Sequence, residues 1–108
     1  MTTRFYFRKI DKDDEKQLKN YLDEKKLSRL AKLLRCSDPA IADFEVRIEY
    51  SQRHNIFSIN LTFIFAKHKL VSLRKSHNLI EAFDLAFDRL VLQMRKIESI
   101  KHDVHPRN

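Results

Sequence analysis

The chain has 108 residues and a formal net charge of +7, from 22 Lys and Arg against 15 Asp and Glu. Such a length supports one domain with a single hydrophobic core, and the excess of cations predicts attraction to a polyanion such as RNA, DNA or an anionic membrane. The chain contains no glycine, which argues against P-loops, dinucleotide-binding turns and nucleophile elbows, because these need glycine for positive φ or close backbone approach.

The first third of the chain predicts a strand and then a helix. In residues 3–10, Phe5 and Phe7 alternate with polar side chains, which is typical of a strand with one buried face. Asp11 is placed to cap a helix that runs toward Arg35. The apolar side chains of the two halves of this helix lie about half a turn apart at 100° per residue. We therefore expect a kink or a break within residues 23–26.

Three further strands follow the break that Pro39 imposes on the helix. Alternating apolar and polar residues predict strands over 44–51 and 57–65, with the phenylalanines of the second facing the core. Lys67, His68 and Lys69 are predicted to form a basic turn, and residues 70–74 a short fourth strand. Ser76 or Asn78 is expected to cap the last helix.

The last helix, predicted over 78–97, carries both a core stripe and an outward surface. Its apolar stripe repeats at steps of three and four and comprises Ile80, Phe83, Phe87, Leu90, Met94 and Ile97. One edge of the stripe carries Arg89, Gln93 and Lys96, while Leu85 and Leu92 point away from it. Arg95 and Lys101 are expected to be ordinary surface charges.

These elements predict an α+β fold of order β-α-β-β-β-α, with a four-stranded sheet and two helices packed on one face. Residues 1–101 are expected to form the one domain, and residues 102–108 a disordered tail.

Nothing in the chain indicates a catalytic, metal or membrane site. Cys36 has no second cysteine for a disulfide, and no secretion signal precedes the first strand, so a cytoplasmic protein is expected. The longest apolar-rich run, 56–66, falls short of the about 20 residues that a membrane span needs. His102 and His105 have a spacing that a metal ion can use, but a frayed tail is the preferred interpretation. We expect no enzyme, cofactor or metal.

Two segments resemble the ribosome hibernation promoting factors, the family that includes the ribosome-associated inhibitor. Residues 26–34, Lys-Leu-Ser-Arg-Leu-Ala-Lys-Leu-Leu, are similar to the basic stretch of that family's first helix. Ala82-Phe83-Asp84, followed by residues 88–90 and by Gln93-x-x-Lys96, is similar to a second family pattern at matching spacing. The resemblance spans about residues 3–101 and is to the short form of the family.

This resemblance implies binding to the small ribosomal subunit, at the decoding region of its 16S-type rRNA. Such proteins occupy the mRNA and tRNA sites and hold translation off under stress or in stationary phase, without chemistry. The protein is then expected to have no membrane or small-molecule partner and to be a monomer off the ribosome.

The cations of the two helices are the candidate RNA contacts, because they are expected to form parallel rows at the spacing of rRNA phosphates. The full set of candidate RNA-binding residues is Lys25, Arg29, Lys32, Arg89, Gln93, Lys96, Lys67 and Lys69. Solvated helix and turn surfaces remain an open alternative for these residues. Two other functions also remain open, namely a general double-stranded RNA-binding module and a protein-interaction domain that uses Leu85, Leu92 and the exposed sheet.

Overall fold

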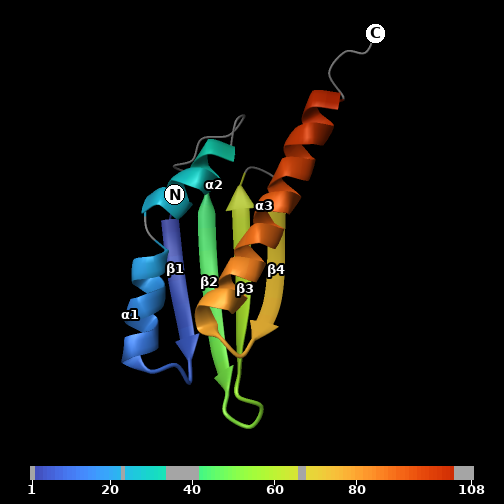
Figure 1. Ribbon diagram of the computed structural model, residues 1–108. Coiled ribbons are helices and arrows are strands. Elements are labelled where there is room, and N and C mark those ends of the chain that lie inside the picture. Colours follow the sequence, from blue (N-terminus) through green and yellow to red (C-terminus); the bar gives the residue numbers. More distant parts are fainter. Residues whose placement is uncertain (1, 23, 34–41, 66–67, 104–108) are drawn as a thin grey trace.

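The computed structural model of the protein describes residues 2–22, 24–33, 42–65 and 68–103. Its element order is β-α-α-β-β-β-α, which confirms the α+β class (Figure 1). The elements are β1 (Thr2–Arg8), α1 (Lys12–Tyr21), α2 (Glu24–Leu33), β2 (Asp43–Ser51), β3 (Ile56–Phe65), β4 (His68–Ser76) and α3 (Leu79–Asp103).

The four strands form one mixed sheet in the order β1-β2-β3-β4. β1 runs parallel to β2, while β3 and β4 continue the sheet as antiparallel hairpins. Parallel neighbours need a long crossover, which α1 and α2 supply here. Asn55 has a φ of 52° in the turn between β2 and β3, a left-handed conformation that asparagine tolerates in a chain without glycine.

The expected interruption of the first helix is a complete break between α1 and α2. Asp11 caps α1, since its carboxylate Oδ1 accepts from the backbone N–H of Asp14 at 2.8 Å. Leu22 ends the helix with φ −82° and ψ 69°, outside the helical region. The break lets Leu18 and Leu30 both reach the core although their faces are out of phase along the sequence.

A single hydrophobic core lies between the sheet and the helices, which cover one face of the sheet (Figure 1). The buried positions of β2 alternate as predicted, those of β3 do so apart from Thr62, which is buried on the other face, and those of α3 follow the predicted stripe. The largest fully buried side chains of this core include Phe44, Phe63, Phe65, Phe83, Leu61, Leu90 and Met94. Deleting one such side chain typically costs about 2–5 kcal/mol.

The structure corrects the predicted turn before β4 and identifies which of the two predicted residues caps α3. β4 begins at His68, so that Lys69 pairs with Ile64 inside the strand instead of lying in a turn. Asn78 is the cap of α3, because its Oδ1 accepts from the backbone N–H of Glu81 at 3.0 Å.

The C-terminal part of α3 continues to Asp103, past the expected domain boundary at residue 101. Residues 104–108 and Cys36 lie outside the described residues, so the predicted tail stays a prediction.

Candidate nucleic-acid interface

Two cations of α2 lie on the side of that helix that faces solvent. Leu30 is fully buried and Leu27 packs against the same core, which fixes the orientation of the helix. Arg29 and Lys32 are exposed, as their sequence spacing predicts. Lys25 belongs to α2, but it lies outside the described side chains.

Two contacts fix how α3 is turned about its axis. On one side, Asp84 accepts a hydrogen bond from the Tyr21 hydroxyl at the end of α1, at 2.7 Å. On the other side, the Gln93 amide donates to the backbone carbonyl of Val71 in β4, at 3.1 Å. Positions 84 and 93 are half a turn apart at about 100° per residue, as these opposite contacts require. One side of α3 therefore faces the first two helices, and the other faces the β4 edge.

Arg89 and Lys96 share the β4 side of α3 with Gln93, so they do not form a row that faces the α2 cations. The expectation of two parallel rows of RNA contacts stays a prediction. The outer surface of α3 separates the two sets, with Leu85 and Leu92 at 44% and 55% exposure. The predicted outward direction of these two leucines is confirmed.

Arg95, which was expected to be an ordinary surface charge, is an exposed cation of α3 that lies near the candidate interface. It lies about three turns after Asp84, on the side of α3 that faces the first two helices. The spacing of 11 residues places Arg95 on the same side of α3 as Asp84, and this could be predicted from the sequence. Only the contact between Tyr21 and Asp84 shows that this side of α3 faces the first two helices.

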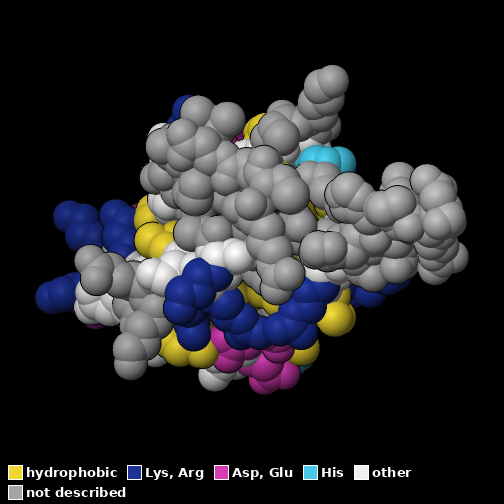
Figure 2. Space-filling view, turned by 90° about the horizontal axis from the view of Figure 1, so that it is seen from above, with side chains coloured by type: hydrophobic (Ala, Val, Ile, Leu, Met, Phe, Trp, Pro, Cys, Tyr) yellow, Lys and Arg dark blue, Asp and Glu magenta, His cyan; other side chains and the backbone are white. Residues whose placement is uncertain are grey.

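We call Arg29, Lys32, Arg89, Arg95 and Lys96 the basic helical surface. Viewed from above, Lys and Arg side chains gather in a band at this end of the molecule, next to a group of Asp and Glu side chains (Figure 2). A shallow hollow of about 310 Å³ lies on α3 and is lined by Arg89, Leu92, Gln93, Arg95 and Lys96. The surface thus combines cations with an apolar centre at Leu92.

The cations of the basic helical surface have no carboxylate partner among the described residues. By contrast, Arg4, Arg8 and Arg47 on the other face of the sheet form ion pairs of 3.5–4.0 Å with Asp43, Glu45 and Glu49. A neighbouring carboxylate weakens the attraction of a cation for a phosphate, even though an exposed ion pair is itself weak. The helical side of the molecule therefore carries five cations that are available to a phosphate.

The structure does not place the two hairpin lysines with this surface. Ser72 is buried against α3, so the even-numbered residues of β4 face the helices. Lys69 is odd-numbered and therefore lies exposed on the opposite face of the sheet. Lys67 lies outside the described residues. Gln93 is near the cations, but its amide already donates a hydrogen bond to β4.

The described residues carry neither a membrane-spanning helix nor a metal-binding cluster. They include no helix with the length and apolarity that a membrane crossing requires. They also contain no group of three or more His, Cys, Asp or Glu side chains arranged to hold a metal ion.

Two solved structures share this fold. The N-terminal domain of Thermus thermophilus Protein Y has a TM-score of 0.72 and 18% identity, over 90% of this chain and 99% of that chain. A ribosomal subunit interface protein from Coxiella burnetii has a TM-score of 0.71 and 16% identity, over 92% and 99%. A comparison with curated protein sequences found no significant match.

The family model described as Sigma 54 modulation protein / S30EA ribosomal protein matches residues 4–101. The chain belongs to this family, which is ribosome-associated and not enzymatic. The resemblance to the hibernation promoting factors, stated from two short segments of sequence, is thereby confirmed.

Proposed function

We propose that this protein binds the small ribosomal subunit at the decoding region of its rRNA and blocks the mRNA and tRNA sites under stress or in stationary phase. It acts by occupancy, as a cytoplasmic monomer off the ribosome, without a cofactor. Residues 1–101 form the ribosome-binding domain.

The observation that carries this proposal is the unpaired charge of the basic helical surface, in a chain that belongs to a ribosome-associated family. Each cation that neutralises a phosphate releases counterions, and this release supplies much of the affinity for RNA. Phosphate contacts of this kind fix position and register, while the shape of the folded RNA supplies selectivity.

The first prediction concerns co-sedimentation of the protein with isolated small subunits and whole ribosomes on gradients. Charge reversal of Arg29, Lys32, Arg89 and Lys96 to Glu is expected to weaken binding by at least about tenfold, because four phosphate contacts become repulsive. Excess free duplex RNA is not expected to displace the wild-type protein. Displacement by duplex RNA would favour a general double-stranded RNA-binding module instead.

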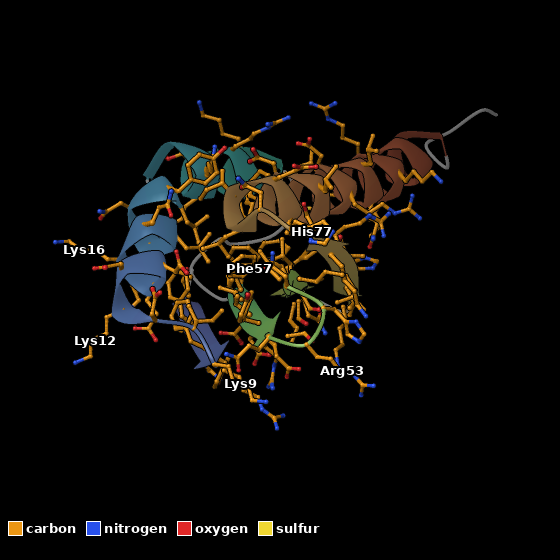
Figure 3. The ribbon with its side chains drawn as sticks, turned by 60° about the horizontal axis from the view of Figure 1, so that its bottom comes forward. Lys9, Lys12, Lys16, Arg53, Phe57 and His77 are labelled. Atoms are coloured by element: carbon orange, nitrogen blue, oxygen red, sulfur yellow. The ribbon has the colours of Figure 1, made fainter. Side chains whose placement is uncertain are left out.

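The matched control reverses four cations at the opposite end of the molecule. Lys9, Lys12, Lys16 and Arg53 lie at the end where β1 passes into α1 and β2 turns into β3 (Figure 3). Reversing them to Glu changes the net charge by the same amount and is expected to leave ribosome binding within about threefold. Equal losses in both variants would show that net charge, and not the basic helical surface, determines binding.

A further inference from the structure

The sheet face that the helices leave uncovered carries its own set of exposed groups. We call it the open sheet face; it is formed by alternate side chains of the four strands (Figure 1). Three large hydrophobic side chains are exposed on it, Tyr6 at 42%, Val71 at 46% and Leu73 at 48%. Exposed apolar side chains that gather on one face often mark a binding surface.

One row of side chains crosses the middle of the open sheet face. The strand register places Tyr6 beside Arg47, Arg47 beside Asn60, and Asn60 beside Leu73. The Arg47 guanidinium carbon lies 4.6 Å from the centroid of the Tyr6 ring. This row lines a shallow hollow of about 510 Å³, and Lys75 lies among its other lining residues.

Asn60 lines this hollow and has a side-chain acceptor without a hydrogen-bond donor in the described part of the chain. Its Oδ1 is excluded from solvent and has no donor among the described residues. A buried acceptor without a partner is unfavourable, so a native structure that keeps one often uses it to bind something else. The acceptor lies beside an aromatic ring and a guanidinium plane.

The free charge on this face is positive and lies on β4. Arg4, Arg8 and Arg47 are engaged by carboxylates, whereas Lys69 and Lys75 form no ion pair within the described part of the chain. These two lysines lie at the two ends of the exposed apolar pair, Val71 and Leu73. A second copy of the chain would bring like charges together here, so the face favours an anionic partner.

We infer that the open sheet face binds a single-stranded RNA segment. One base packs against the Tyr6 and Arg47 pair and a neighbouring base against Leu73. The Asn60 side chain turns so that its Oδ1 accepts from the amino or imino N–H of one of these bases. The phosphates on either side lie near Lys75 and Lys69. Aromatic and arginine side chains on an exposed sheet suit single strands, because unpaired bases offer both their faces and their hydrogen-bonding edges. This inference goes beyond the proposed function, which uses the opposite face.

Fluorescence anisotropy with an end-labelled single-stranded RNA of mixed sequence tests this inference. Tyr6→Ala is expected to weaken binding about tenfold, since it removes a stacking surface, and Tyr6→Phe to leave binding nearly unchanged. Leu85→Ala, which removes an exposed apolar side chain from α3 outside the hollow on that helix, is the matched control and is expected to have no effect. A duplex of the same sequence is expected to bind the open sheet face more weakly.

Asn60→Leu separates a binding role from a structural one. It removes the unused acceptor at similar volume, so we expect weaker RNA binding with a melting temperature that is unchanged or higher. A lower melting temperature with unchanged binding would overturn the role given to Asn60.

Unchanged binding by Tyr6→Ala, or no binding of the RNA by the wild-type protein, would overturn the inference as a whole. The inference would also be overturned if the variant of the basic helical surface lost RNA binding while Tyr6→Ala kept it. Failure of ribosome co-sedimentation would leave this test intact, because the anisotropy measurement needs no ribosome.

Discussion

Asp14 is a carboxylate whose charge the fold disfavours. It lies in the first turn of α1, near Asp11 and Asp13. Burial raises the pKa of Asp14, and repulsion from Asp11, a hydrogen bond with Asp11 and repulsion from Asp13 raise that pKa further. The folded protein therefore holds this proton more tightly than the unfolded chain does. Its contribution to stability is present below the ordinary carboxyl pKa of 3.8 and is lost as the pH rises through the raised folded value.

Asp14→Asn is accordingly expected to raise the free energy of unfolding modestly at pH 7, because the amide carries no charge that burial penalises. The gain is expected to vanish near pH 3, where Asp14 is already protonated in both states. Urea unfolding at the two pH values measures both effects. Asp13→Asn is the control and is expected to lose about 0.3–1 kcal/mol at pH 7, since it removes a favourable charge at the helix N-terminus. A loss for Asp14→Asn at pH 7 would contradict the prediction.

Single residues show where sequence reasoning reaches its limit in this chain. Spacing alone places Gln93 on the same side of α3 as Arg89 and Lys96, and the structure agrees. Spacing does not reveal that β4 lies beneath that side and takes the Gln93 amide as a hydrogen-bond donor. Lys69 shows the same limit. The sequence predicted a turn at this residue, but β4 already begins at His68, so Lys69 lies inside the strand and occupies one face of the sheet.

At the scale of elements, Tyr21 ties the break between α1 and α2 to α3. Its hydroxyl donates to the carboxylate of Asp84, at 2.7 and 2.8 Å from the two oxygens. Its ring meets Phe83 edge to face at 6.0 Å, and Lys26 Nζ lies 4.4 Å from the ring centroid. These contacts fix where α2, and with it Arg29, sits relative to α3.

Tyr21→Phe is expected to lower the free energy of unfolding by about 1–3 kcal/mol, because a hydrogen bond to a charged group is lost. It is also expected to weaken ribosome binding several-fold, since α2 is no longer held in place. The control is Tyr50→Phe, which removes a hydroxyl bonded to Asn55 at the other end of the molecule. It should cost stability without changing ribosome binding, as urea unfolding and co-sedimentation will show. Equal binding by both variants would contradict a positioning role for Tyr21.

Local pattern predicted the elements of this fold well, because hydrophobic period and turn chemistry act over a few residues. The change of phase between Leu22 and Leu27 indicated the helix break. The contact between Tyr21 and Asp84 joins residues 63 positions apart, and no local pattern contains it. The rotation of α3, and therefore the place of Arg95 in the candidate interface, depends on that contact.

At the scale of the whole molecule, the two faces differ in how their charges are used. Arg4, Arg8 and Arg47 of β1 and β2 are paired with carboxylates, whereas the cations of the basic helical surface have no carboxylate partner among the described residues. A net charge of +7 on its own would not distinguish the faces. The pairing does, since the helical side has the five unpaired cations of the basic helical surface, whereas the open sheet face keeps only Lys69 and Lys75 unpaired among its described cations.

Ribosome binding is therefore expected to weaken steeply with salt. If four or five cations neutralise phosphates, the logarithm of the affinity should fall with the logarithm of salt concentration at a slope of about −3 to −4. Replacing Arg29 by Gln should reduce that slope by about one. Binding measured over a series of salt concentrations gives both values, and a slope near zero would contradict an interface built on phosphate contacts.

The β4 edge, finally, bears on how the protein behaves when it is concentrated. An unpaired outer strand offers its backbone as a template for a strand of another molecule, which is one route to aggregation. Here the carbonyls of Val71 and Leu73 already accept from Gln93 and Arg74 of the same chain. Sheet growth from this edge must first break those bonds, so the side chains that border the candidate interface also help to keep neighbouring copies separate.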